Sequence, residues 1–490
     1  MKNVKYNIKN FYKMKIAYFS AEVYPFSKVG GLADVAGSLP IFIKNKGINI
    51  IVLSPYYSKF IKEKNFKIKE KVELKVEFDN KNLITEWIHI SYKNVSFYLL
   101  KYEEYFGRDY IYVPSSGEDE KQYKRFALFS YASLLFLKKI NFKPDIIHIN
   151  DWHTSFIPLY IKRKFNRDEF FKEIKILLTI HNLSYQGIYE KKVLKEIGFD
   201  EEIKEIESNG NINFLKAGIL FSDYINTVSK SYSEEILTPQ FGCGLDEILK
   251  SKKNKIYGIL NGIDYEEWNP EKDKDIYKNY SIKDFKEGKE INKKKLREEF
   301  NLKDDNSILI GMVSRLTYQK GIDLLIESFN EFFKRELQFI LLATGEKRYE
   351  DKVKELEVKY KEKFRFLPKF DLILAKKIYA GSDLFLIPSI FEPCGLTQMI
   401  SMRFGTIPFG FKTGGLKDSI KDYEEGGYGF LFDEYKKEKF IEKLDKIISV
   451  FKDKEKWNKL IEECMRKDFS WENSAKEYIK LYERIKYEGV

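Results

Sequence analysis

The sequence predicts an α/β protein made of two doubly wound domains with parallel sheets. Short β-branched or aromatic runs alternate with longer amphipathic stretches, which is typical of βαβ units. The runs are too apolar for a sheet with one face in water, so helices should cover both faces. The chain has 490 residues, more than one domain usually holds.

Two series of predicted strands define the domains. The first series covers residues 15–19, 48–53, 145–149, 175–180 and 224–228, and the second covers 307–313, 338–343, 364–367, 384–387 and 428–432. Between them lie residues 256–270 and a strongly charged stretch, 271–299, and after them residues 468–485 show helical spacing with Ser470 as a cap. We therefore predict an N-terminal extension (1–13), a first domain (14–255), a linker region (256–299), a second domain (300–467) and a C-terminal helix (468–490) that packs back toward the first domain.

Composition excludes several classes of protein. Apolar residues make up 43% and charged residues 33%, which is typical of a globular chain. The longest apolar stretches fall far short of the about 20 residues of a membrane-spanning helix, so we expect a soluble protein without a membrane partner. The net charge of +11 is interleaved with Glu, as on solvated surfaces, so we expect no nucleic-acid partner.

Cysteine usage and the N-terminus indicate the compartment. The three Cys residues are far apart, with no spacing typical of a disulfide framework or a zinc knuckle. Residues 1–13 lack an apolar core, and Met14 directly opens an apolar run, so we interpret them as an extension or an upstream start. We expect a cytoplasmic protein.

The loop after the first predicted strand contains a candidate diphosphate site. In doubly wound sheets, ligands bind at the carboxyl ends of strands. Here Lys28 precedes Gly30 and Gly31, and a helix-like stretch begins at about Leu32. Paired glycines let backbone N–H groups approach a phosphate, and Lys28 adds a full charge. The alternative is a tight turn beside a solvated Lys28.

In the second half, the loop 314–321 carries two cations at a strand-to-helix turn. Arg315 offers a planar fork for phosphate oxygens and Lys320 a point charge next to a helix start. Together they could neutralise a diphosphate leaving group without a metal. The alternative is that both are solvated side chains near a turn.

The segment 388–398, PSIFEPCGLTQ, is the most informative. Glu392 lies in a loop that should be rigid and partly buried, where a carboxylate requires partners such as sugar hydroxyls. Residues 395–397 should open a helix beside a phosphate. Glu392 could instead cap a neighbouring backbone. Downstream, Gly414 and Gly415 again precede a helix. We interpret them as a further wall of the donor pocket, the pocket that would bind the sugar and its phosphate.

Three of the four His residues, His148, His153 and His181, lie close together in the sequence, with Asp151 between the first two. A metal site is conceivable, but His148 lies inside an apolar run and is better explained as a core residue, so we predict no metal. His181 follows a strand and should face the substrate, with Asp151 and His153 on the neighbouring loop. One of these groups could orient an acceptor hydroxyl or stabilise positive charge on a sugar.

Together, these motifs resemble the bacterial glycogen synthase and plant starch synthase family. The resemblance covers nearly the whole chain from Met14. It is carried by KVGGLADV (28–35), DWHTS (151–155), HNLSYQG (181–187), NGID (261–264), SRLTYQKG (314–321), FEPCGLTQ (391–398), KTGGL (412–416) and DFSWE (468–472).

The resemblance implies a GT-B fold, with two Rossmann-like domains facing a deep cleft, and transfer of glucose from ADP-glucose to the non-reducing end of an α-1,4-glucan with retention of configuration. It implies no cofactor, and a plastid location if the source were a plant or alga. The implied catalytic residues are His181, Arg315, Lys320 and Glu392. The implied donor-binding residues are Lys28, Gly30, Gly31, Cys394, Gly395, Leu396, Thr397, Gly414 and Gly415. The implied acceptor-side residues are Asp34, Asp151, His153 and Asn182.

The mechanism and some alternatives stay open at the level of sequence. Retention could come from front-face attack or from a covalent glycosyl-enzyme; we favour the former, because no carboxylate stands out as a nucleophile. We expect each domain to supply half of one donor pocket that closes for reaction. Another retaining GT-B transferase using UDP-glucose, or a non-catalytic glucan-binding scaffold, remains an alternative. Ile400 replaces a second Glu found in many related transferases, and the dinucleotide pattern of dehydrogenases is absent after the first strand.

Overall fold

The computed structural model describes residues 14–61, 66–114, 117, 119, 121–200 and 202–487. These residues form two compact units. The first contains residues up to Val228, 233–259 and those from Trp471 onward, and the second contains 229–232 and 260–470. Each unit is a Rossmann-like α/β domain, which confirms the predicted fold class. The predicted extension at 1–13 lies outside the described residues.

The first unit is built on a nine-stranded mixed sheet in the order β12-β11-β7-β6-β1-β2-β5-β4-β3. The prediction of a wholly parallel sheet is wrong here, because β3 pairs antiparallel with β4, and β4 with β5. The charged alternation of β3 suits an edge strand with one face in water. The strands are β1 (Lys15–Phe19), β2 (Asn49–Pro55), β3 (Ile68–Phe78), β4 (Lys81–Tyr92), β5 (Val95–Lys101), β6 (Ile146–Asn150), β7 (Lys175–Ile180), β11 (Tyr224–Thr227) and β12 (Ile256–Gly258).

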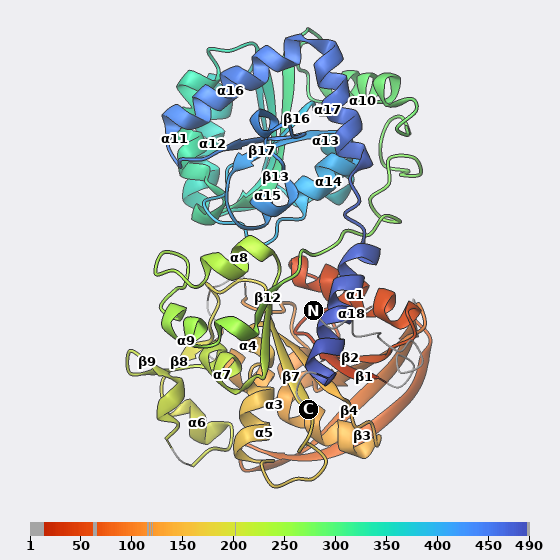
Figure 1. The fold of residues 1–490 in the computed structure, drawn as a ribbon, viewed down its shortest axis with the longest axis vertical. Helices are drawn as coiled ribbons and strands as arrows, with labels where there is room; N and C mark the ends of the chain where they lie inside the picture. The colour runs from red at the N-terminus through yellow and green to blue at the C-terminus, as the bar shows by residue number, and fades with distance from the viewer. Residues whose placement is uncertain are drawn as a thin grey trace, which may run out of the picture. The chain divides into compact units, whose positions relative to one another are not determined.

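Helices flank this sheet, and one of them comes from far along the chain. The predicted final helix exists as α18 (Trp471–Tyr487) and lies beside α1 (Gly31–Asn45) (Figure 1). Trp471, Tyr478 and Tyr482 of α18 are buried in the core of the first unit. The other elements are α2 (Glu103–Phe106), α3 (Gln122–Lys139), α4 (Asp151–Thr154), α5 (Phe156–Arg163), α6 (Val193–Glu196), α7 (Phe214–Phe221), α9 (Asp246–Ser251) and a small sheet of β8 (Ile188–Tyr189), β9 (Glu207–Ser208) and β10 (Asn211–Asn213). Of α8 (Lys230–Glu235), the residues from Ser233 onward belong to this unit and those up to Tyr232 to the second.

The second unit contains a six-stranded sheet in the order β15-β14-β13-β16-β17-β18, and all its pairings are parallel, as predicted. Its strands are β13 (Ile308–Leu316), β14 (Leu337–Gly345), β15 (Phe364–Leu367), β16 (Leu384–Ile387), β17 (Ile407–Phe411) and β18 (Phe430–Phe432). Its helices are α10 (Phe285–Glu299), α11 (Ile322–Phe332), α12 (Lys347–Lys359), α13 (Leu372–Gly381), α14 (Thr397–Arg403), α15 (Gly414–Ser419), α16 (Lys437–Lys452) and α17 (Lys454–Arg466).

Strand order reverses once in the main sheet of each unit. In the second unit the chain runs outward from β13 to β15 and then returns to the other side of β13 with β16. In the first unit β1 lies between β2 and β6 in the same way. Crossovers on either side of such a point lead away from it, so the loops at the carboxyl ends leave a ligand crevice there. The site residues are therefore expected after β1, β6, β13 and β16.

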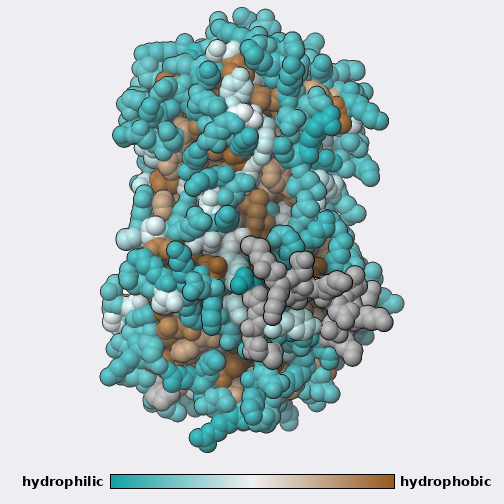
Figure 2. Space-filling model, in the orientation of Figure 1, coloured by the Kyte–Doolittle hydropathy of each residue, from teal (hydrophilic) through white to brown (hydrophobic). Residues whose placement is uncertain are grey.

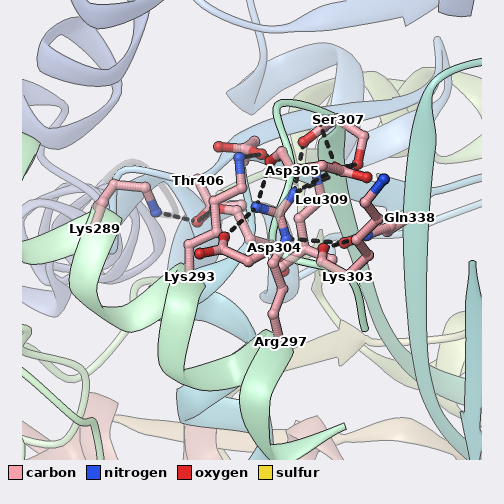
Figure 3. A network of polar contacts seen from close by, with 12 residues as sticks. Lys289, Lys293, Arg297, Lys303, Asp304, Asp305, Ser307, Leu309, Gln338 and Thr406 are labelled. Carbon is pink, nitrogen blue, oxygen red and sulfur yellow. Dashed lines mark hydrogen bonds and ion pairs between the residues drawn. The ribbon is translucent and has the colours of Figure 1, made fainter. Parts of the chain in front are cut away.

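Buried cations attach helix α10 to the main sheet of the second unit, as Figure 3 shows. The guanidinium of Arg297 donates to Oε1 of Gln338 at 2.8 Å and to the carbonyl oxygens of Asp305 and Ser307 at 2.7 and 2.8 Å. Lys293 pairs with Asp383 at 2.7 Å. These contacts fix α10, which comes from the charged stretch between the two predicted series of strands, at the amino ends of β13 and β14.

The outer surface is polar where it can be seen. Figure 2 shows hydrophilic residues over most of the visible face of both units. No helix among the described residues combines the length and the apolar character that crossing a bilayer requires.

Lys289 of α10 provides a test of this attachment. Its buried ammonium donates to the carbonyl oxygens of Ala380 and Phe404, at the C-terminal ends of α13 and α14, and to Oγ1 of Thr406. Lys289→Met removes all three hydrogen bonds, and we expect it to lower the free energy of unfolding of the second unit by about 2 kcal/mol. The measurement is the urea midpoint by circular dichroism. Lys294→Met, at an exposed position of the same helix, is the control and should leave the midpoint unchanged.

Candidate functional site

The loop after β1 is organised by a buried glutamate that the sequence analysis did not select. Glu22 is 1% exposed, and its carboxylate accepts hydrogen bonds from the N–H groups of Val29 and Gly30 at 2.5 and 3.2 Å. Burial raises the pKa of Glu22 to about 7, although these bonds and one from Tyr112 lower it. The N–H group of Gly30, predicted to face a phosphate, is therefore directed at Glu22, while Gly31 opens α1.

Lys28 lies in the same loop and is partly exposed. Its ammonium pairs with Oδ1 of Asp34 at 2.6 Å, and it lies 5.6 Å from the ring centroid of Tyr24. The structure thus joins Lys28, predicted on the donor side, to Asp34, predicted on the acceptor side. A surface pair of this kind is weak enough to open when a stronger anion arrives.

Asp151 connects the loops after β6 and β7. It has a left-handed backbone with φ of 54°, uncommon for a residue with a side chain, and it is 8% exposed. Its Oδ1 accepts from the N–H of His181 at 2.7 Å, and the N–H of Asn182 also donates to this carboxylate. Burial raises the pKa of Asp151 to about 7, and the Glu22 carboxylate adds to this rise. Asp151, His181 and Asn182 are thus brought together at one edge of the sheet.

The other two histidines of this region have different surroundings. His148 is fully buried on β6, with Nδ1 at 2.7 Å from the hydroxyl of Tyr482 and Nε2 at 2.7 Å from that of Thr179. His153 is packed among the rings of Tyr112, Phe126 and Trp152. Among the described residues, no three or more His, Cys, Asp or Glu side chains gather closely enough to hold a metal ion.

In the second unit the loops after β13 and β16 meet at an ion pair. Lys320 Nζ lies 2.6 Å from Oε2 of Glu392, with side chains only 18% and 10% exposed, and Oε2 also accepts from the hydroxyl of Ser389 at 2.9 Å. Glu392 is therefore buried with partners, as its predicted environment requires. Arg315 is exposed at the end of β13. The predicted pair of cations lies on one loop, with Lys320 held by the carboxylate.

Backbone contacts hold these two loops together. The N–H of Ile390 donates to the carbonyl of Gln319 at 2.9 Å, and the side chain of Gln319 donates to the carbonyl of Phe391. Gly321 has a φ of 73°, and a Cβ atom there would lie 1.9 Å from the carbonyl oxygen of Pro388. Only glycine permits this approach, which brings Lys320 to Glu392.

The third loop of the second unit, after β17, packs against the loop after β16. The N–H of Gly415 donates to the carbonyl of Glu392 at 2.8 Å, and a Cβ on Gly415 would lie 1.9 Å from the carbonyl oxygen of Cys394. Gln398 of α14 donates to the carbonyls of Cys394 and Gly395 at 2.9 and 2.7 Å. Among the remaining predicted donor residues, Leu396 caps α14, Thr397 opens it and Gly414 opens α15.

Cys394 is a structural thiol in this arrangement. It is 7% exposed, and burial raises its pKa to about 12, while Asn261 of the NGID segment hydrogen-bonds to it and lowers the pKa. A thiol with so high a pKa is protonated near neutral pH and is a poor nucleophile.

Sequence reasoning missed several residues that shape the two groups of loops. Glu22 left a detectable signal, because it is an acid in a largely apolar loop directly after a strand. Ser389, Gln398 and Asn150 are ordinary polar residues whose partners lie elsewhere in the chain, so no local pattern distinguishes them.

Sequence comparisons identify the class to which this geometry belongs. The family described as "Starch synthase catalytic domain" matches residues 15–251, and "Glycosyl transferases group 1" matches residues 292–463. The two Rossmann-like units with their loops at the reversal points define a glycosyltransferase of the GT-B fold.

Relatives that match over nearly the full length show to which glycosyltransferase family the chain belongs. The chain is 43% identical to the glycogen synthase of Fervidobacterium nodosum, over 96% of this chain and 99% of that protein. It is 41% identical to the glycogen synthase of Thermotoga maritima, with the same coverage of both chains. The chain therefore belongs to the glycogen synthase family, and the resemblance seen in its motifs is confirmed.

Two solved structures are similar to this one. The catalytic domain of starch synthase IV from Arabidopsis thaliana, bound to ADP and acarbose, has a TM-score of 0.87 and 33% identity, over 96% of this chain and 99% of that one. Sucrose-phosphate synthase from Thermosynechococcus elongatus has a TM-score of 0.61 at 16% identity, with the same coverage, and supports the fold alone.

The buried histidines predict an acid-sensitive first unit. Burial lowers the pKa of His153 from 6.5 to about 3, so between these values the unfolded chain binds a proton that the folded chain does not. The free energy of unfolding therefore falls as the pH is lowered through this window. His153→Phe keeps a ring of similar size, and we expect it to reduce the loss of stability between pH 7 and pH 5 by about 1–2 kcal/mol.

The measurement is the urea midpoint at both pH values. His89→Phe is the comparison variant: burial also lowers the pKa of His89 on β4, but the Glu70 carboxylate opposes this, so the substitution should reduce the loss of stability less than His153→Phe does. An equal loss of stability in wild type and His153→Phe would contradict the assignment of a neutral His153.

Proposed function

We propose that this protein is a glycogen synthase that transfers glucose from ADP-glucose to the non-reducing end of an α-1,4-glucan, with retention of configuration. The observation that carries the proposal is the Lys320–Glu392 pair at the strand reversal of the second unit. A cation for phosphate and a carboxylate for sugar hydroxyls are neighbours there, as a nucleotide sugar requires. Membership of the glycogen synthase family, and a structural relative bound to ADP and acarbose, support the same substrates.

The donor residues can be assigned roles from their contacts. Oε2 of Glu392 accepts hydrogen bonds from the Lys320 ammonium and the Ser389 hydroxyl. Among the described residues, Oε1 is therefore the oxygen available to accept hydrogen bonds from glucose hydroxyls. Lys320 reaches a diphosphate by sharing its ammonium hydrogens between Glu392 and the anion, and exposed Arg315 adds a planar fork. The segment from Cys394 to Thr397, with Gly414 and Gly415, lies next to this pair and is proposed to contact sugar and phosphate.

The first unit supplies the remaining roles. His181 is proposed to lie beside the reacting sugar, and Asp34, Asp151, His153 and Asn182 to form the acceptor side. Lys28 and the loop of Gly30 and Gly31 are proposed to contact the donor. The N–H of Gly30 is already bound by Glu22, so the group of this loop that contacts the donor is the Lys28 ammonium. Lys28 pairs with Asp34, and this ion pair opens when the donor binds.

For the mechanism we propose front-face attack with stabilisation of the departing diphosphate. The glucosyl bond breaks with both electrons on the diphosphate oxygen, whose charge Arg315 and Lys320 neutralise. The acceptor hydroxyl attacks the same face of the sugar and loses its proton to the leaving group. Glu392 is a poor nucleophile here, because the ammonium of Lys320, 2.6 Å from Oε2, withdraws negative charge from its carboxylate.

Removal of either cation should slow departure of the diphosphate leaving group. We expect Lys320→Ala or Arg315→Ala to lower kcat by about 100-fold to 1,000-fold. Arg315→Ala should change thermal stability little, whereas Lys320→Ala should also lower it, because the substitution removes the cation beside the buried Glu392 carboxylate. The measurement is release of ADP during elongation of glycogen. Lys334→Ala, at an exposed position outside the loops, is the control. Turnover at the wild-type rate in both loop variants would refute the leaving-group role.

The donor is tested by direct competition. Purified protein with glycogen should incorporate labelled glucose from ADP-glucose at least about 10-fold faster than from UDP-glucose, as expected if the base contributes about 1.4 kcal/mol of discrimination. Faster incorporation from UDP-glucose would correct the donor alone. Binding of glucan without transfer from any sugar nucleotide would support the scaffold alternative instead.

A further inference from the structure

Asn150, at the end of β6, lies between β1 and the candidate site residue His181. Its side chain is fully buried, and it makes three hydrogen bonds with residues far away in sequence. Nδ2 lies 2.8 Å from the carbonyl oxygen of Phe19, while Oδ1 lies 3.2 Å from the hydroxyl of Tyr18 and 2.8 Å from Nε2 of His181. All four residues belong to the first unit.

The backbone determines the orientation of this amide. A carbonyl oxygen only accepts hydrogen bonds, so the group of Asn150 that faces the carbonyl of Phe19 must be its NH₂. The reverse orientation would place two carbonyl oxygens in contact inside the protein, where an unmet acceptor is costly. Oδ1 therefore faces Tyr18 and His181.

The orientation of the amide in turn determines where His181 carries its proton. Oδ1 can only accept, so Nε2 of His181 must be the protonated nitrogen, and the hydroxyl of Tyr18 also donates to Oδ1. Burial lowers the pKa of His181 to about 3, so the ring is neutral near neutral pH. A neutral imidazole with its proton on Nε2 has an acceptor lone pair on Nδ1.

The neighbouring titratable groups leave this arrangement intact. Asp151 accepts from the backbone N–H of His181 and not from its ring. The ring of His148 is bound to the hydroxyls of Tyr482 and Thr179.

We propose that Asn150, oriented by the carbonyl of Phe19, is a positioning residue that holds His181 in the Nε2–H tautomer, so that Nδ1 accepts a hydrogen bond from a sugar hydroxyl. This inference rests on the proposed function for the identity of the ligand. It assigns His181 the role of a neutral acceptor, which binds a hydroxyl and supplies neither a proton nor positive charge. The sequence left two roles open for this region, orienting a hydroxyl or stabilising positive charge on a sugar. The proposal assigns His181 the first of these.

The tautomer is measured directly in the full chain. The protein contains only four His residues, so the ring nitrogens of a ¹⁵N-histidine sample give few signals, and the signals of His181 are those lost in His181→Gln. We expect a protonated Nε2 and an unprotonated Nδ1 in the wild type. A wild-type His181 with its proton on Nδ1 would overturn the proposal.

Two substitutions at position 150 separate positioning from general disruption. Asn150→Ala removes the acceptor, so we expect His181 to populate the Nδ1–H tautomer and kcat for glucose transfer to fall by about 10-fold or more. Asn150→Asp keeps an oxygen opposite Nε2, so the proton should stay on Nε2, with more activity than Asn150→Ala. Tyr18→Phe, which keeps both the amide and the carbonyl of Phe19, should leave the tautomer unchanged.

The results distinguish this inference from the proposed function. An unchanged His181 tautomer in Asn150→Ala would overturn the positioning role whatever the activity. If Asn150→Ala does not fold, the wild-type and Asn150→Asp spectra still decide, because a neutral His181 ring with its proton on Nδ1 and none on Nε2 in either would refute the proposal. A wild type with the expected tautomer but no transfer from any sugar nucleotide would refute only the function.

Discussion

The reversal of strand order in each main sheet is the constraint on which the candidate site depends. It places the loops after β1 and β6 next to each other in the first unit, and those after β13 and β16 next to each other in the second. Lys320 and Glu392 are 72 residues apart, and their contact follows from two adjacent parallel strands ending at the same edge. Close packing at Gly321 and Gly415 then fixes the loops to within hydrogen-bond distance.

Buried polar groups give these loops their precision. Glu22, Asp151 and Glu392 are all buried, and each carboxylate accepts hydrogen bonds that hold a loop in place. In the first unit the partners are backbone N–H groups, whereas in the second the main partner is an ammonium. This difference is chemical as well as structural, because the pKa values of Glu22 and Asp151 are raised by burial, while Glu392 has a full positive charge beside it.

Much of this architecture could be predicted from sequence, and the failures have physical causes. All ten predicted strands are present, because buried parallel strands are continuous apolar runs such as KILLTI. Strand β3 was missed because an edge strand with charged residues looks like a solvated surface, and β17 because Pro408 and Gly410 lie within it. The sequence placed the Gly30 loop at a phosphate, but the preference of backbone N–H groups for the nearest carboxylate, Glu22, could not be seen without the fold.

Helix α18 has a consequence for how the molecule is made. Trp471, Tyr478 and Tyr482 fill the same core as β1 and β6, and Tyr482 bonds to His148 in the middle of that sheet. During synthesis on a ribosome, the strands of the first unit emerge long before these side chains exist. That unit can complete its interior only after residues 471–487 have been translated, so the nascent chain must carry an unfinished first half while the second half folds.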